Sequence, residues 1–133
     1  MVINNNNKFT DESFREKLSK KEYNILRKKG TESPFTGKYW NNNNEGIYIC
    51  KGCSQALFSS TNKFDSLCGW PSFFDSFRKN SVKFLDDSSH GMNRVEVVCS
   101  KCESHLGHIF NDGPQPTGLR YCMNSIALNF IPK

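Results

Sequence analysis

The sequence has no long run of apolar residues. None of its 133 residues belongs to a stretch of the roughly 18 consecutive apolar positions that a membrane-spanning helix needs. The first twenty residues also lack the basic start and apolar core of a secretory signal peptide. We therefore expect a cytoplasmic protein, or one from the interior of an organelle, with no membrane partner.

Concentrated basic charge is absent as well. The net charge is +5, from 18 basic and 13 acidic residues, but the basic residues are dispersed and form no stripe of the kind that follows a phosphate backbone. We expect no nucleic-acid partner. The length suits one domain with a modest core, to which a bound metal would add useful stability, and we expect a monomer.

The N-terminal third shows helix signals. Ser19 and Glu22 form a capping box that predicts a helix at about 20–29, with Gly30 as its C-terminal cap. Phe14 and Leu18, four residues apart, predict another helical turn or two upstream. We assign 1–18 to a tail and helical lead-in, and 19–133 to a single domain.

From Gly46 onward the sequence favours strands. Segments rich in β-branched and aromatic residues lie at 46–50, 55–60, 82–86, 94–99 and 119–131. If the last one is unbroken, Cys122 and Asn124 share a face with Leu128. Proline and glycine between 101 and 118 predict an irregular connection. The expected fold class is mainly β with short N-terminal helices.

Four of the six cysteines form two C-x-x-C pairs, the spacing that lets one tight turn aim two sulfurs at a tetrahedral zinc. The pairs are Cys50 with Cys53 and Cys99 with Cys102, and Gly52 suits the first turn. Most of the β-structure lies between them, so the metal would clip the two ends of the sheet together. Four thiolates close the coordination sphere, which predicts one structural zinc. The alternatives are buried or disulfide-bonded cysteines, or a redox motif that would need a βαβ setting.

Cys68 and Cys122 are left outside this metal set. A lone cysteine is often only a small buried hydrophobe, and a lone histidine is often only a hydrogen-bonded structural residue. Here, however, His105 and His108 occur together in His-Leu-Gly-His, and Arg120 lies near Cys122 in the sequence. Such groups lower the pKa of a thiol or donate protons. The combination indicates a thiol enzyme.

The order of these motifs resembles the B family of methionine-R-sulfoxide reductases, over about Ser19–Phe130. The strings that carry the resemblance are GTESPFTGKYW (30–40), both C-x-x-C pairs, CGWPSF (68–73), HGM (90–92), HLGHIFNDGPQPTG (105–118) and RYCMNSIAL (120–128). The resemblance implies two antiparallel β-sheets with helices packed at the side. It also implies reduction of the R epimer of methionine sulfoxide, mainly within proteins and peptides, with thioredoxin as reductant.

Carried over residue by residue, the resemblance gives each motif a role. The nucleophile falls on Cys122 and the recycling cysteine on Cys68. The paired histidines fall on His105 and His108. The remaining assignments are Trp70 for the substrate pocket, Asn124 for the active-site asparagine, and Cys50, Cys53, Cys99 and Cys102 for the zinc ligands. Arg120 is our candidate for substrate binding, and Leu67 replaces a glycine that the family usually has before its recycling cysteine.

The predicted chemistry needs a nucleophile and an acid together. We expect Cys122 to attack the sulfoxide sulfur while His105 or His108 protonates the oxygen, directly or through water. The resulting sulfenic acid would condense with Cys68, and thioredoxin would reduce the disulfide. The alternative is a non-catalytic four-cysteine zinc module that binds nucleic acid or protein. The 13% aromatic content supports it, but it gives Cys68 and Cys122 no role.

Overall fold

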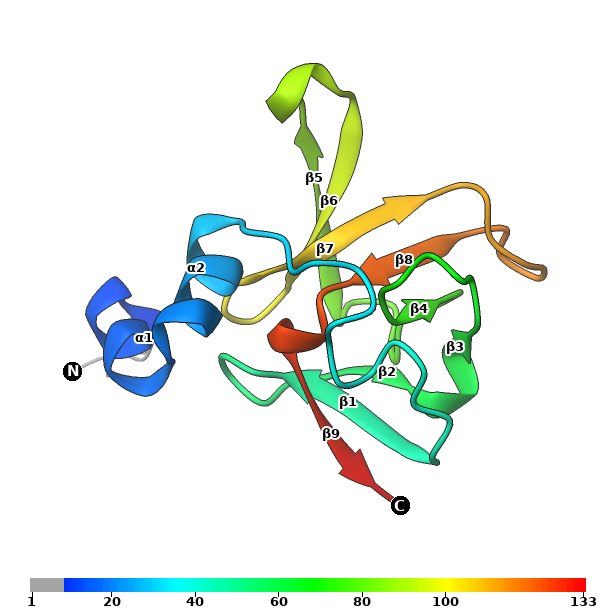
Figure 1. The fold of residues 1–133 in the computed structure, drawn as a ribbon, viewed down its shortest axis with the longest axis horizontal. Helices are drawn as coiled ribbons and strands as arrows, with labels where there is room; N and C mark the ends of the chain where they lie inside the picture. Colours follow the sequence, from blue (N-terminus) through cyan, green and yellow to red (C-terminus); the bar gives the residue numbers. More distant parts are fainter. Residues whose placement is uncertain (1–8) are drawn as a thin grey trace.

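The computed structural model describes residues 9–133 (Figure 1). Two short helices begin the described chain, α1 (Asp11–Lys17) and α2 (Lys20–Lys28). The predicted capping box is present, because the Ser19 side chain accepts from the Glu22 amide and the Glu22 side chain accepts from the Ser19 amide. Within residues 9–133, neither helix has the length and apolar character needed to cross a bilayer.

The end of α2 differs from the prediction by one residue. Lys29, not Gly30, adopts the left-handed conformation, with φ 62° and ψ 35°. Gly30 continues the cap, its amide donating to the Asn24 carbonyl at 3.1 Å. The left-handed residue therefore carries a long charged side chain, which turns away from the helix toward the strands.

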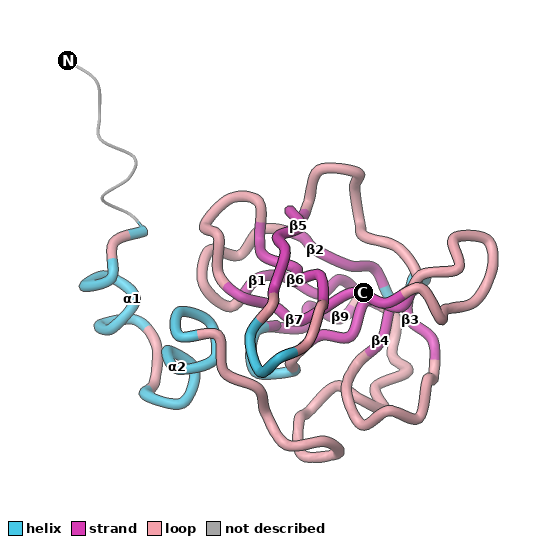
Figure 2. The backbone as a smooth tube through the Cα atoms, turned by 90° about the horizontal axis from the view of Figure 1, so that it is seen from above, coloured by secondary structure: helices cyan, strands magenta, loops and turns pink. Residues whose placement is uncertain are grey.

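Within residues 9–133, nine strands form two sheets, which confirms the expected fold class. The smaller sheet has the order β2 (Ala56–Ser59), β1 (Gly46–Cys50), β9 (Leu128–Pro132). The larger has the order β3 (Lys63–Phe64), β4 (Ser72–Phe73), β8 (Arg120–Met123), β7 (His105–Phe110), β6 (Arg94–Cys99), β5 (Val82–Asp87). Neighbouring strands are antiparallel in both sheets. Figure 2 shows the two helices together at one flank of the strands.

The segment 119–131 is not one strand. After β8 the chain forms a short 3₁₀ turn, Ser125–Ala127, and then enters β9 in the other sheet. The buried Glu32 carboxylate accepts from the amides of Ser125 and Ile126, both at 2.9 Å, and so caps the start of this turn. The prediction that Cys122 shares a strand face with Leu128 is therefore wrong, because the chain changes sheets between them.

The connection 101–118 is also more regular than predicted. It contains β7, which lies between β6 and β8 and completes the centre of the larger sheet. Gly107 permits this close pairing, because a β-carbon there would lie 2.1 Å from the Cys122 carbonyl oxygen. The prolines of this segment, together with Gly113 and Gly118, lie beyond the strand. The two-residue strands β3 and β4 had no recognisable sequence signal.

Aromatic side chains join the two sheets. Phe58 of β2 stacks on Phe73 of β4 with ring centroids 4.2 Å apart, and Tyr48 of β1 meets Phe73 edge-on at 5.1 Å. All three are fully buried. Because such rings bury large areas and prefer offset or edge-on contact, they fix one sheet against the other. The relative placement of Cys122 and the segments that surround it depends on this core.

Candidate functional site

The two C-x-x-C pairs meet between the sheets. Cys50 ends β1 in the smaller sheet, and Cys99 ends β6 in the larger one. The Sγ atoms of Cys50 and Cys102 are 3.7 Å apart, those of Cys53 and Cys99 are 3.5 Å apart, and all four lie within 4.8 Å of one another. Tetrahedral zinc with Zn–S bonds of about 2.3 Å would space its sulfurs by about 3.8 Å. The four residues fit a metal ion, which would join two sheets and not two ends of one.

The two C-x-x-C turns, residues 50–53 and 99–102, are called the knuckles here and share one backbone geometry. In each, the residue after the second cysteine is left-handed, Ser54 with φ 68° and Glu103 with φ 61°. Its amide donates at 2.8 Å to the carbonyl of the first cysteine, Cys50 or Cys99. Gly52 is not the left-handed residue, so the turn does not use its conformational freedom. It provides space instead, since a β-carbon there would lie 3.0–3.3 Å from neighbouring side chains.

The N-terminal helices pack against the knuckles. The Arg27 guanidinium lies 4.2 Å over the Phe14 ring and donates to the Cys102 carbonyl at 2.9 Å. From α1, Lys17 Nζ donates to the Gly52 carbonyl at 2.6 Å. Each knuckle is therefore tied to a helix through a backbone carbonyl, which makes the four-cysteine cluster part of the packed interior.

The two remaining cysteines form a separate pair. Cys122 lies in β8 opposite Ser72 of β4, and Cys68 lies in the loop before β4. Their Sγ atoms are 3.6 Å apart. The Ser66 hydroxyl donates to Cys68 Sγ at 2.9 Å, and the Ser72 hydroxyl lies 3.4 Å from it. Both cysteines are half-buried, so the pair combines mutual contact with access from solvent.

The surroundings divide the charge of this pair unequally. The hydrogen bond from Cys122, helped by Ser66 and Ser72, lowers the pKa of Cys68 to about 4 against the opposing effect of burial. The same hydrogen bond, together with burial, raises the pKa of Cys122, while the nearby Arg120 charge works in the other direction. The surroundings therefore favour the thiolate form of Cys68 over that of Cys122.

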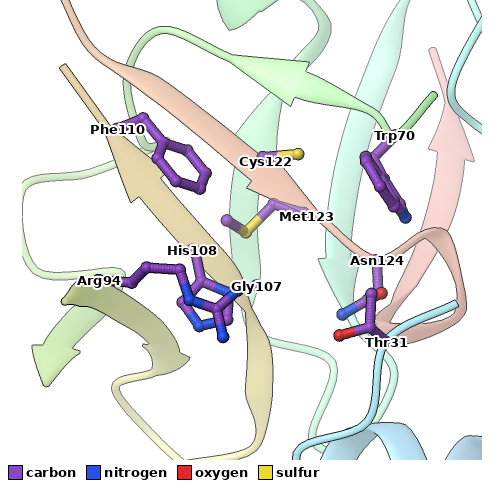
Figure 3. A pocket seen from close by; sticks show the side chains of 9 residues that line it. All are labelled: Thr31, Trp70, Arg94, Gly107, His108, Phe110, Cys122, Met123 and Asn124. Atoms are coloured by element: carbon purple, nitrogen blue, oxygen red, sulfur yellow. The ribbon is translucent and has the colours of Figure 1, made fainter. Parts of the chain in front are cut away.

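Cys122 opens into a small pocket, and Cys68 does not line it. The pocket encloses about 100 Å³ and is lined by Thr31, Trp70, Arg94, Gly107, His108, Phe110, Cys122, Met123 and Asn124 (Figure 3). The Trp70 indole is fixed by its N–H, which donates to the Glu32 carbonyl at 3.0 Å. The pocket thus presents an aromatic wall, a thiol and two basic side chains to whatever enters it.

The two histidines share one face of the sheet because of a β-bulge. Residues three apart in a regular strand point to opposite faces. In β7, Gly107 pairs with Val97 but His105 pairs with Val98, so Leu106 is an extra residue on that strand. The bulge brings the rings of His105 and His108 together, with centroids 5.4 Å apart. Only His108 lines the pocket.

A carboxylate holds each ring. His105 Nδ1 lies 2.7 Å from Glu96 Oε2, and His108 Nε2 lies 2.7 Å from Asp87 Oδ2. Burial lowers the pKa of His105, and Glu96 opposes this. Hydrogen bonds from Ser89 and His108 hold the pKa of Asp87 well below its usual range. Asp87 is thus an ionised, buried partner for the histidine of the pocket.

Asn124 and Arg120 lie beside the pocket in different ways. Asn124 lines it, but its side chain accepts from the Glu32 amide at 2.9 Å and donates to the Leu106 carbonyl at 3.2 Å. Asn124 therefore links the backbone at Glu32 to the β-bulge at Leu106. Arg120 is not among the lining residues. Its guanidinium binds the Asp112 carboxylate at 2.8 and 3.2 Å and stacks on Phe110.

Five charged residues of the site were absent from the sequence-based assignment: Lys29, Glu32, Asp87, Arg94 and Glu96. One of them had a readable signal, because Glu96 interrupts the apolar run Val95-Glu96-Val97-Val98 in a predicted strand, where a buried charge needs a partner. Glu32 and Asp87 lie far in sequence from the groups they bind. Their roles depend on the fold.

Comparison with known proteins agrees with this geometry. The family model described as the SelR domain matches residues 18–132. A protein of Acinetobacter baylyi is 54% identical over 119 residues, covering 90% of this chain and 86% of its own. One from Cellvibrio japonicus is 52% identical, covering 95% and 90% respectively, and one from Thiobacillus denitrificans is 53% identical, covering 93% and 94%. All three are named peptide methionine sulfoxide reductase MsrB. The chain therefore belongs to the MsrB family, the B family of methionine-R-sulfoxide reductases that its motifs resemble, and is an oxidoreductase.

Proposed function

We propose that the protein reduces the R epimer of methionine sulfoxide in oxidised proteins and peptides, with Cys122 as nucleophile, Cys68 as resolving thiol and thioredoxin as reductant. One observation carries the proposal: the Cys122 sulfur lines the pocket beside Trp70 while lying 3.6 Å from the second thiol. The indole suits apolar contact with the S-methyl group of the substrate. Arg94 and His108 provide donors for its oxygen.

The first chemical step consumes one proton. Cys122 passes its proton to the Cys68 thiolate, and the Cys122 thiolate attacks the sulfoxide sulfur. A second proton reaches the sulfoxide oxygen from His108, the histidine that lines the pocket. Oxygen leaves with Cys122 as a sulfenic acid, and methionine departs as the thioether. Cys122 is oxidised by two electrons, and the substrate sulfur is reduced by two.

The second step regenerates the enzyme. The Cys68 thiol condenses with the Cys122 sulfenic acid, which forms a disulfide and releases water. Thioredoxin, a dithiol, then exchanges with this disulfide, becomes oxidised itself and returns both cysteines to the reduced state. A gap of 3.6 Å between the sulfurs supports this step, because the bond of about 2.05 Å requires only a small local movement.

The ion that we propose for Cys50, Cys53, Cys99 and Cys102 is zinc. Four thiolates leave no open position, so the ion supplies structural closure and takes no part in the reaction. A non-catalytic zinc module is not favoured, because it gives the pocket and the Cys68–Cys122 pair no role. We further propose that the enzyme acts as a monomer without nucleic acid, since its basic residues are dispersed.

Single-turnover kinetics test the proposal. Zinc-loaded protein is mixed with a peptide that contains one methionine sulfoxide, supplied as the separated R or S epimer, and free thiols are counted. We expect reduction of the R epimer only, with the loss of two thiols per chain. Cys122→Ser should abolish the reaction and keep the metal. Residual turnover near the unmodified rate in Cys122→Ser would place the nucleophile elsewhere.

Cys68→Ser separates the two steps. The first turnover should survive, because the sulfenic acid forms before Cys68 condenses with it, although loss of the Cys68 base should slow it. Cycling with thioredoxin should fall sharply, whereas a small thiol that reaches Cys122 directly should sustain activity. Full thioredoxin-supported cycling in this variant would show that Cys68 is not the resolving thiol.

A further inference from the structure

The two histidine–carboxylate pairs are not independent, because a single lysine bridges them. Lys29 Nζ lies 3.2 Å from Asp87 Oδ1 and 3.2 Å from Glu96 Oε1. The other oxygen of each carboxylate binds a histidine. One cation therefore stands between two carboxylates, with a histidine on the far side of each.

Lys29 comes from outside the larger sheet. It caps the C-terminal end of α2, whereas Asp87, Glu96 and the histidines belong to β5, β6 and β7. A left-handed backbone is unfavourable for a residue with a β-carbon, so glycine is the usual choice at such a position. A lysine that adopts this conformation directs its ammonium group at the two carboxylates, a contact that glycine would not make.

The charges around the histidines balance only with Lys29 included. His105 is faced by Glu96, by His108 and by Lys29. Asp87, which is 2% exposed in its side chain, is faced by His108, Lys29 and a longer contact of 3.5 Å from Arg94. The strand on the other side of β7 is β8, in which Cys122 is the residue that pairs with His108. Two buried carboxylates thus meet Lys29 and Arg94, and without Lys29 one negative charge would be left unpaired.

Without Lys29, the carboxylates of Asp87 and Glu96 would favour protonation of the other groups that they bind. Here those partners are imidazole rings, the groups whose protonation changes most readily near neutral pH. A histidine held permanently protonated is a poor proton donor, because an acid works best when its pKa lies near the working pH. Burial is the main cause that lowers the pKa of His105, and the Lys29 charge acts in the same direction, which favours release of the proton.

We propose that Lys29 is a positioning residue for the reduction: its charge neutralises the two carboxylates, so that the histidine pair gives up its proton to substrate and does not retain it. This inference rests on the proposed role of the histidines as proton donors. Lys29 itself does not line the pocket, so it acts through Asp87 and Glu96 and touches no substrate.

The experiment compares zinc-loaded unmodified protein with three variants. Lys29→Met removes the charge and keeps an unbranched side chain, and Lys29→Arg keeps the charge. Lys28→Met is the matched control, because Lys28 is exposed, sits over the Tyr23 ring and makes no contact with the carboxylates. The first readout, which does not depend on activity, is the NMR pH titration of the His105 ring.

We expect the pKa of His105 to rise in Lys29→Met, because the positive charge that opposes its protonation is gone; the rise should be modest, since Lys29 is 40% exposed. Lys29→Arg and Lys28→Met should titrate like the unmodified protein. The second readout is the pH profile of the single-turnover rate. Its high-pH limb, where the donor loses its proton, should move upward in Lys29→Met, with KM unchanged.

The two readouts separate failure of this inference from failure of the proposed function. If Lys29→Met titrates like Lys28→Met while the protein reduces methionine sulfoxide, Lys29 has no electrostatic role and the inference is overturned. If His105 shifts as expected but the pH profile does not move, the charge of Lys29 does not affect the proton donor of the pocket. The role of Lys29 in the reaction then falls, although the thiol chemistry of Cys122 remains.

Discussion

Two sulfur clusters in one small fold show how the surroundings decide what a cysteine does. In the knuckles, four sulfurs within 4.8 Å of one another sit on matching backbone turns braced by two helices. In the Cys68–Cys122 pair, two sulfurs 3.6 Å apart lie half-buried beside a pocket and two serine hydroxyls. Four thiolates close a coordination sphere, whereas two leave a sulfur open to substrate. Number and access separate a structural cluster from a reactive one.

Removing one sulfur from the knuckles should destabilise the fold, whereas removing one from the Cys68–Cys122 pair should not. We expect Cys99→Ser to lose its zinc and to unfold far more readily, because metal binding at such sites contributes on the order of 10–16 kcal/mol to folding. Elemental analysis and thermal unfolding measure both effects. Cys122→Ser, the matched removal of a sulfur from the other cluster, should retain one zinc per chain. A well-folded protein purified without metal would contradict the prediction.

On the reactive side, the histidines should matter to rate and not to metal content. We expect His108→Ala to slow single-turnover reduction by roughly 10²–10⁴-fold, the usual effect of losing a general acid. His105→Ala should slow it less, because His105 is buried and is not among the residues that line the pocket. Zinc content should stay constant in both variants. Unchanged single-turnover rates in both would make the histidines structural residues.

Much of this division was readable from the sequence because it depends on local spacing. The C-x-x-C pairs predicted a metal cluster, and the capping box predicted the start of α2. The bulge at Leu106 was not readable, because His-Leu-Gly-His in a regular strand would place its histidines on opposite faces. The carboxylates that hold those histidines come from other strands, and only tertiary packing brings them into contact.

The same limit explains the errors in the strand predictions. The segment 119–131 has strand composition throughout, yet a carboxylate from Glu32, about ninety residues away in sequence, caps a turn in its middle. Likewise, β7 was obscured by the prolines and glycines that follow it, although Gly107 is there because β8 approaches so closely. The composition of a segment indicates strand structure, but the position at which the strand is interrupted depends on residues far away in the sequence.

The pH dependence of Cys68 alkylation should differ from that of an ordinary thiol. Because the pKa of Cys68 is lowered to about 4, its thiolate is lost only as the pH falls through that value. Between pH 5 and 9, its alkylation by iodoacetamide should therefore be nearly independent of pH. In Cys122→Ala the main hydrogen bond is gone, so the pKa should rise and alkylation should increase with pH across this range. Mass spectrometry of the Cys68 peptide measures both. A rate that climbs about tenfold per pH unit in unmodified protein would contradict the shared proton.

The smallest expected effect concerns Leu67, where this chain departs from the pattern of its family. Leu67 is left-handed, with φ 62°, and its side chain is 74% exposed. Its amide donates to Asp65 Oδ1 at 3.1 Å, which holds the loop that carries Cys68. Glycine adopts this conformation without the cost that a β-carbon brings, and an exposed side chain contributes little packing. We expect Leu67→Gly to stabilise the protein by about 1 kcal/mol, measured by urea unfolding. It should leave formation of the Cys68–Cys122 disulfide as fast or faster, because the sulfurs are already 3.6 Å apart.

Leu85→Gly is the control, since Leu85 is an exposed leucine in β5, where glycine should destabilise by roughly 0.5–1 kcal/mol. If mass spectrometry after one equivalent of substrate finds a persistent Cys122 sulfenic acid in unmodified protein and a disulfide only in Leu67→Gly, then Leu67 has suppressed the resolving step, and the reactive pair works as a single thiol.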